Sequence, residues 1–113
     1  MPALNVQVQP DLSPDLDLAG VLALFATAAE LADAELEVIA GDDDGLYVNY
    51  DFRTRDLPRL WEVLQSQVFL DTTQGPRLAQ ASIVTCEGNR GWDDYLLLHH
   101  HDRTFELDTL SSG

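Results

Sequence analysis

The chain has 113 residues, 45% of them hydrophobic, and its 20 acidic and 6 basic side chains give a formal net charge of −14 at pH 7. About 100 to 150 residues form one ordinary domain, so we expect a single α+β domain over residues 1–110 and a frayed tail over residues 111–113. Binding to nucleic acids and to anionic membrane surfaces rests on Arg and Lys, so the charge argues against both and favours a basic protein as partner.

Cysteine content and hydropathy indicate the compartment. The single cysteine, Cys86, forms neither an internal disulfide nor a thiolate metal cluster, which fits a reducing environment. The sequence contains neither an apolar run of about 18 residues, the least that a membrane span needs, nor the basic start of a secretory signal. Six Arg, nineteen Leu and no Lys are typical of the coding bias of a GC-rich bacterial genome. We therefore expect a soluble cytoplasmic protein of bacterial origin.

The first third of the chain predicts a strand followed by a helix. Apolar and polar residues alternate from Ala3 to Gln9, which is the period-two pattern of a half-buried strand. Ser13 is suited to the N-cap of a helix with Pro14 at its first position. Apolar residues then recur at three- and four-residue spacing as far as Ala32, which predicts a helix with one apolar stripe.

A hairpin and a second helix follow. Two period-two runs, residues 36–40 and 46–53, flank an Asp-rich loop at residues 41–45, which predicts two antiparallel strands. Asp56 is suited to cap the second helix, whose apolar stripe ends near residues 68–70.

The last third of the chain predicts a loop and further strands. Residues 71–76 have the composition of a loop. The strand candidates are residues 78–86, 92–101 and 104–108. The order is therefore β-α-β-β-α-β-β, with a sixth strand at the end. It predicts an α+β fold in which two helices pack on one face of a mainly antiparallel sheet, with ferredoxin-like or split βαβ topology.

The hairpin between the fourth and fifth strands defines which residues face the core. A four-residue loop over residues 88–91 would place Cys86 opposite Asp93 and turn Ile83 and Leu96 toward the core. The helix-free face of the sheet would then carry Tyr47, Asn49, Asp51, Val84, Tyr95, Leu97 and His99. Such a mixed aromatic, apolar and acidic face suits the docking of another protein or the formation of a homodimer.

An aromatic ring next to carboxylates predicts a partner-binding site. Trp92 stands at the mouth of this hairpin beside Asp93 and Asp94. A Trp ring supplies buried area and a cation-π surface, and carboxylates accept hydrogen bonds from the guanidinium of Arg. The Asp-rich loop of the first hairpin adds acidic groups to the contact surface. The predicted partner-binding residues are Asp42, Asp43, Asp44, Trp92, Asp93, Asp94 and Tyr95.

Three consecutive histidines offer a metal-binding alternative. His99 and His101 lie one residue apart on a predicted strand, so both side chains point to the same side and can ligate one ion. An aspartate at the same end of the sheet would supply the third ligand that zinc needs, the candidates being Asp42, Asp43, Asp44 and Asp102. The Asp-rich loop lacks the ligand spacing and the final Glu of an EF-hand. Exposed histidines on an edge hairpin explain the pattern more simply, so we predict no bound metal and no cofactor.

The sequence offers no motif for catalysis. A nucleophilic Cys86 would need a base such as His within about 3 Å, but the predicted register separates Cys86 from His101 by about 26 Å. Glu87 and Asp93 would raise the pKa of the thiol and oppose formation of the thiolate. The chain contains no Gly-rich phosphate loop, G-x-S-x-G elbow or H-E-x-x-H helix. We therefore expect a protein that is not an enzyme.

These observations predict a small acidic module that binds a basic protein, for example as an inhibitor or immunity-type partner of a basic effector. Two alternatives remain: a metal-binding or metal-sensing domain at His99 and His101, and a homodimeric structural module joined through the helix-free face. Electrostatic steering predicts that association with a basic partner slows as salt screens the charges.

Overall fold

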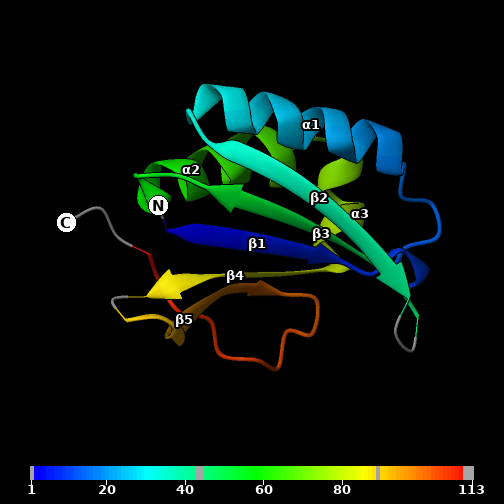
Figure 1. Ribbon diagram of the computed structural model, residues 1–113. Coiled ribbons are helices and arrows are strands. Elements are labelled where there is room, and N and C mark those ends of the chain that lie inside the picture. The colour runs from blue at the N-terminus through cyan, green and yellow to red at the C-terminus, as the bar shows by residue number, and fades with distance from the viewer. Residues whose placement is uncertain (1, 43–44, 89, 111–113) are drawn as a thin grey trace.

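A computed structural model describes residues 2–42, 45–88 and 90–110 (Figure 1). Asp43, Asp44 and the predicted tail lie outside these ranges. The elements of the structure are β1 (Ala3–Val8), the 3-10 turn η1 (Pro10–Leu12), α1 (Leu18–Leu31), β2 (Glu35–Asp42), β3 (Leu46–Arg53), α2 (Leu57–Leu64), the π-helical segment η2 (Gln65–Phe69), α3 (Gln74–Ala79), β4 (Ser82–Gly88) and β5 (Gly91–His100). None of the helices in the described ranges is long and apolar enough to span a membrane.

The five strands form one antiparallel sheet with the order β2-β3-β1-β4-β5. β1 is central, and β2 and β5 are the two edge strands. The helices lie together on one side of the sheet (Figure 1). The predicted α+β class and antiparallel sheet are confirmed, whereas the described residues contain three α-helices instead of the two predicted.

The core lies between the sheet and the helices. The alternation of β1 turns Leu4, Val6 and Val8 toward the helices, and all three are fully buried. Phe25 of α1 packs against Tyr50 of β3, with ring centroids 4.4 Å apart. Because each Å² of apolar surface removed from water contributes about 25 cal/mol, these side chains hold the helices on the sheet.

The first helix begins later than the sequence predicts. α1 starts at Leu18 with Asp17 at the N-cap, so the prediction that Ser13 caps the helix at Pro14 was wrong. Ser13 is buried in a turn, where its carbonyl accepts a hydrogen bond from the Leu16 N–H at 2.9 Å. Leu16 packs against the core. This tertiary contact favours a turn at the residues that the local pattern assigns to the first helical turn.

The second helix begins as predicted. The Asp56 carboxylate accepts a hydrogen bond from the Arg59 N–H at 3.1 Å, and α2 follows from Leu57. After Leu64 the helix widens into η2, and helical backbone continues to Phe69, close to the predicted end.

A third helix, α3, replaces the predicted loop and the first residues of the predicted fourth strand. The Asp71 carboxylate accepts a hydrogen bond from the Gln74 N–H at 2.8 Å at the start of this helix. Gly75 allows α3 to approach the Phe69 carbonyl, which a Cβ atom would overlap. Leu78 is fully buried in the core. Packing of this short helix therefore overrides the loop composition, and β4 starts later than predicted.

The predicted sixth strand is absent from the described part of the C-terminal segment. Asp108 of this segment is hydrogen-bonded to Leu97 at the outer edge of β5. The ring of Phe105 stacks on His100, with centroids 4.0 Å apart. This stacking holds the segment in a turn, so it does not run alongside β5 as a strand.

Candidate protein-binding surface

The face of the sheet away from the helices, called the open face below, contains a hollow of about 480 Å³. All five strands contribute to it, because on each strand the residues between the core-facing positions point to this side. The residues that line this open-face hollow are Asn5, Gln7, Ile39, Asn49, Asp51, Ile83, Thr85 and Trp92. The hollow is thus the part of the open face where side chains from the whole sheet converge.

Side-chain amides form the floor of the open-face hollow. Asn5 and Gln7 of β1 alternate with buried leucine and valine, and Asn49 of β3 lies directly opposite Gln7. Thr85 of β4 lies opposite Asn5 on the other side. Amide groups both donate and accept hydrogen bonds. The floor can therefore pair with the polar backbone of a bound polypeptide.

Apolar side chains from the two edge strands form the walls. Ile39 on β2 and Trp92 on β5 line the same hollow, although these strands lie at opposite edges of the sheet. The open-face hollow therefore extends across the sheet from one edge strand to the other. Trp92 is 45% exposed. An exposed tryptophan at the wall of a hollow is the type of side chain that contributes most to binding at protein interfaces.

Asp51 is the acidic group of the open-face hollow. Its side chain is 19% exposed, and one Arg53 nitrogen lies 3.7 Å from its carboxylate. Burial raises the pKa of the Asp51 carboxyl; the charge of Arg53 lowers it, whereas those of Glu37 and Glu87 raise it. The Asp51 carboxylate is partly desolvated and has one cation at a distance. Charge-assisted hydrogen bonds from the guanidinium of a bound partner would therefore stabilise its charged form.

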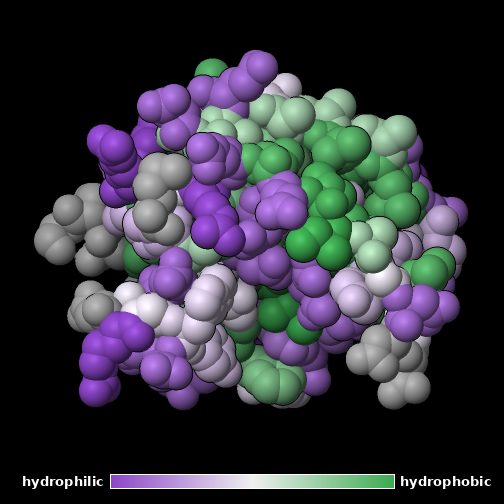
Figure 2. All heavy atoms as spheres, viewed as in Figure 1, coloured by the Kyte–Doolittle hydropathy of each residue, from purple (hydrophilic) through white to green (hydrophobic). Residues whose placement is uncertain are grey.

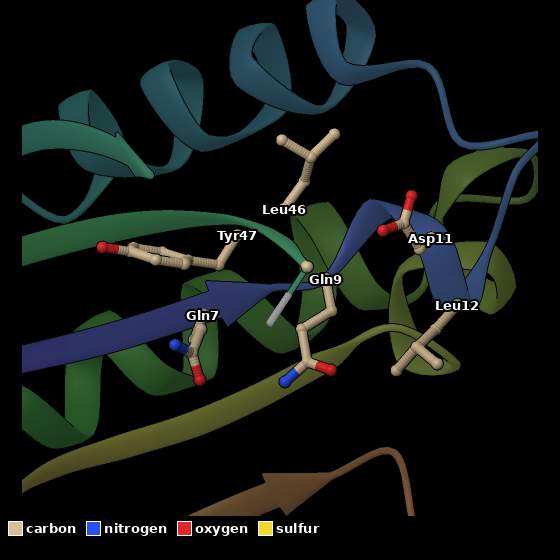
Figure 3. A pocket seen from close by; sticks show the side chains of 7 residues that line it. Gln7, Gln9, Asp11, Leu12, Leu46 and Tyr47 are labelled. Carbon is tan, nitrogen blue, oxygen red and sulfur yellow. The ribbon is translucent and has the colours of Figure 1, made fainter. Parts of the chain in front are cut away.

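A smaller hollow of about 270 Å³ adjoins the first one, since Gln7 lines both (Figure 3). It extends the open face toward η1, with the side chains of Gln9, Asp11 and Tyr47 around it. The Tyr47 ring lies over Gly41 of the neighbouring strand, in space that a Cβ atom at Gly41 would occupy. The open face therefore offers a continuous polar path that is longer than the open-face hollow alone.

The four predicted partner-binding residues on β5 do not share one site. Trp92 lies in the open-face hollow. Asp93 is exposed and Tyr95 is 58% exposed. Asp94 is half-buried and lines a different hollow, together with Arg55. Trp92 is therefore the residue of this group that the structure places with Asp51.

Asp42, the described aspartate of the predicted acidic loop, lies on the edge strand opposite the one that carries Trp92. Asp42 is exposed at the end of β2, while Asp43 and Asp44 lie outside the described residues. Because β2 and β5 are the two edge strands, four inter-strand spacings, about 19 Å along the sheet, separate them. Asp42 is not among the residues that line the open-face hollow, so it adds to the overall negative charge only.

The predicted register of the β4-β5 hairpin was wrong. Cys86 lies opposite Leu96 and not opposite Asp93. The register shifts next to Gly88, where a Cβ atom would overlap the Asp94 carbonyl. A β-bulge of this kind adds residues to one strand and changes which side chains face each side of the sheet.

The pairing of β4 with β1 corrects the predicted composition of the open face, because Val84 lies opposite the core residue Val6 and Ile83 lies opposite Gln7. Val84 is fully buried in the core, and His99 Nε2 donates a hydrogen bond to the Ala79 carbonyl at 2.9 Å, so neither belongs to the open face as predicted. Ile83, predicted to face the core, lines the open-face hollow. Sequence reasoning also missed Gln7 as a site residue, although the polar half of the β1 alternation contained that signal.

The three histidines do not converge on one point. His99 is held by Ala79, whereas His100 Nδ1 accepts a hydrogen bond from the Asp102 N–H at 2.9 Å. Burial and the neighbouring charge of His101 lower the pKa of His100, while Asp102 raises it. Within the described ranges, no group of three His, Cys, Asp or Glu side chains lies close enough to hold a metal ion. The metal-binding alternative thus gains no geometric support from these residues.

Cys86 is a core residue of β4. Its side chain is fully buried. Burial raises the pKa of the thiol to about 11, and the charges of Asp108 and Glu87 add to this rise. The neutral thiol therefore predominates at neutral pH, and the side chain contributes packing.

The fold and surface together define an α+β domain with a hollowed, polar open face and an exposed tryptophan at its wall. Comparison of the chain with protein-family models, with curated proteins and with solved structures finds no match. The geometry of the open face is therefore the basis for a functional proposal.

Proposed function

We propose that this protein is an acidic protein-binding module that receives an arginine-bearing segment of a basic protein on its open face. The observation that carries this proposal is the presence, in one hollow, of the exposed Trp92 ring and the partly buried Asp51 carboxylate. Within one bound segment, arginine side chains can stack on the ring and donate two parallel hydrogen bonds to the carboxylate. An arginine side chain therefore fits this pair better than a lysine does.

The net charge supports a basic partner. A charge of −14 creates a negative potential around the molecule, which steers a positively charged protein toward it. Salt shortens the range of this potential. Association is therefore expected to slow as the ionic strength rises, while the buried contacts at Trp92 and Asp51 govern dissociation.

The same features support a more specific role, that of an inhibitor or immunity-type partner in the cytoplasm. A module that covers the basic surface of an effector would block the access of that surface to other anionic ligands. We propose that this role is binding and not catalysis. The neutral, buried thiol of Cys86 supports this view, because nucleophilic cysteines require an accessible thiolate.

The strand order supports a ferredoxin-like arrangement as the finer description of the fold. β4, β1, β3 and β2 are neighbours in this order, with α1 between β1 and β2 and α2 between β3 and β4 in the chain. β5 extends the sheet beyond β4. Such an arrangement leaves one face of the sheet free of helices, which the proposed mode of binding requires.

An NMR titration with a defined probe tests this function. The probe is a synthetic peptide of alternating Arg and Leu, added to isotope-labelled protein. We expect the largest shifts at the backbone amides of Asn5, Asn49 and Thr85 and at the Trp92 indole N–H. Asp51→Asn is expected to weaken binding by about tenfold or more, because a hydrogen bond to a charged group contributes about 1.5 to 3 kcal/mol.

Glu30→Gln is the matched control, because it removes one negative charge on the helix side of the molecule. It should change the affinity by less than about twofold, as expected for a distant, screened charge. Equal weakening by Asp51→Asn and Glu30→Gln would show that only net charge matters. Shifts located outside the open face, or equal binding of a peptide with Glu in place of Arg, would contradict the proposal.

A further inference from the structure

The outer side of α1 and the neighbouring edge strand β2 form an exposed apolar surface. We define this α1/β2 surface by Leu18, Leu22, Val38 and Ala40, which are all exposed. Leu22 is 42% and Val38 43% exposed. Figure 2 shows hydrophobic side chains gathered over these two elements. Contiguous apolar surfaces of this kind mark sites of interaction.

The composition of α1 explains why this surface is apolar. Among the 14 residues of the helix, Glu30 is the one charged side chain. Val21, Phe25, Ala28 and Ala29 face the core, yet the opposite side of the helix is also built largely from Leu and Ala. A helix with one side on a core normally presents polar groups on the other side. The outer side of α1 therefore has the character of a contact surface.

β2 adds an open sheet edge to this surface. It is eight residues long and forms one end of the strand order, so within the described residues its outer backbone groups have no strand beside them. At the opposite edge of the sheet, Asp108 already pairs with Leu97 of β5. Unpaired N–H and C=O groups on an edge strand are ready to pair with another strand.

We propose that a second copy of this chain binds the α1/β2 surface, with the two β2 strands paired antiparallel across a two-fold axis. The two sheets would then join into one, and both α1 helices would lie on the same side of it. Symmetric self-pairing of one surface is the commonest way in which soluble proteins form dimers.

The β2 sequence permits this pairing without opposed carboxylates. Pairing about Val38 places Val38 opposite its copy, Glu37 opposite Ile39, and Glu35 opposite Gly41 of the second chain. Side chains of directly opposed residues lie on the same face, so the helix side of the joint sheet receives Val38 against Val38. Apolar contact therefore replaces charge repulsion at the centre of the interface.

The distribution of charge favours a second copy over a basic partner at this surface. Two chains of −14 repel each other over most of their surfaces. On its helix side this surface carries Leu, Val and Ala in place of carboxylates, and Glu37 and Glu35 of β2 would lie opposite Ile39 and Gly41 of the second chain, so two copies can meet there with less repulsion. A basic protein would find no partner charges among these residues. The dimer would also leave the floor of the open-face hollow accessible, so both proposals can hold together.

Light scattering after size exclusion tests the dimer directly. We expect a mass of twice 12.5 kDa at high protein concentration. The dimer fraction should increase between about 0.05 M and about 0.5 M salt, because screening removes repulsion between the two acidic chains. Binding of a basic partner should respond to salt in the opposite direction, so the two interactions can be told apart.

Two variants place a charge in the surface without disturbing the core. Leu22→Glu and Val38→Glu substitute exposed side chains and should each shift the mass to that of one chain. Leu107→Glu is the matched control, because Leu107 is 48% exposed and adjoins Asp108, which pairs with the opposite sheet edge. It should leave the mass of the dimer unchanged. Circular dichroism of each variant confirms that its fold is retained.

Three outcomes would overturn this proposal. The first is a wild-type protein that stays at 12.5 kDa at every concentration and salt level. The second is a dimer that Leu22→Glu and Val38→Glu leave intact, particularly if Ile83→Glu on the open face dissociates it. The third is equal dissociation by Leu107→Glu, which would show a general effect of added charge.

Discussion

Asp108 and Leu97 are joined by two hydrogen bonds at the outer edge of β5. The Asp108 N–H donates to the Leu97 carbonyl at 2.7 Å, and the Asp108 carboxylate accepts from the Leu97 N–H at 2.8 Å. Both backbone groups of Leu97 are therefore satisfied on the side where, among the described residues, β5 has no neighbouring strand. The C-terminal segment thus protects part of one edge of the sheet, whereas no described segment covers β2 at the other.

Replacing Asp108 should weaken this protection. Asp108→Ala removes the acceptor for the Leu97 N–H, so we expect about 1 kcal/mol of destabilisation of the segment and about fivefold faster hydrogen exchange at the Leu97 amide. Asp108→Asn retains an acceptor oxygen and should change the exchange rate much less. Equal exchange rates in wild type and Asp108→Ala would show that the carboxylate does not protect this edge.

The N-caps of the first two long helices differ in their side-chain bonding. The Asp56 carboxylate caps α2 through the Arg59 N–H, whereas the Asp17 side chain at the start of α1 makes no such bond within the described part of the chain. Asp56→Ala should therefore lower the free energy of unfolding by about 1 kcal/mol, and Asp17→Ala by clearly less. Urea unfolding of both variants provides the comparison. A larger loss for Asp17→Ala would contradict the capping assignment.

Gly88 has a steric role in the bulge between β4 and β5. A Cβ atom there would overlap the Asp94 carbonyl, so Gly88→Ala should destabilise the protein by about 1 to 3 kcal/mol and alter the fluorescence of Trp92 on the same hairpin.

Gly20→Ala is the control for this substitution. The atom nearest to a Cβ at Gly20 is a carboxylate oxygen of Asp17, 2.9 Å away at the flexible end of a side chain that can turn aside. Alanine is a better helix former than glycine by about 1 kcal/mol, so Gly20→Ala should stabilise α1. Thermal unfolding should thus shift in opposite directions for the two variants, and shifts in the same direction would contradict the steric role of Gly88.

The raised pKa of Asp51 predicts a specific dependence of stability on pH. Because its folded-state pKa lies above the unfolded value near 3.8, the stability that protonated Asp51 contributes is present below pH 3.8 and is lost as the pH rises through the folded-state pKa. Asp51→Asn is uncharged throughout. The free energy of unfolding of this variant, relative to wild type, should therefore increase with pH over this window and then level off. Urea unfolding at several pH values measures this difference, and a constant or decreasing difference would contradict the pKa shift.

Local patterns predicted those features of the fold that depend on neighbouring residues in the chain. The alternation from Ala3 to Gln9 correctly predicted β1, and the Asp56 carboxylate caps α2 as its position implied. Local patterns were insufficient where long-range packing competes with them. Leu16 packs on the core and delays the start of α1, and Leu78 is buried in a helix although its neighbourhood has the pattern of the beginning of a strand.

The same contrast between local sequence signals and long-range packing holds for the candidate site. Composition determined the negative charge, and the position of an aromatic residue beside two aspartates was enough to single out Trp92. Only the tertiary structure decided that Trp92 lines one hollow with Asp51 and with Ile39 from the opposite edge strand, because this arrangement depends on the strand order and on the bulge at Gly88. A sequence records charge and periodicity directly, whereas contacts between distant strands arise from the simultaneous packing of the whole sheet.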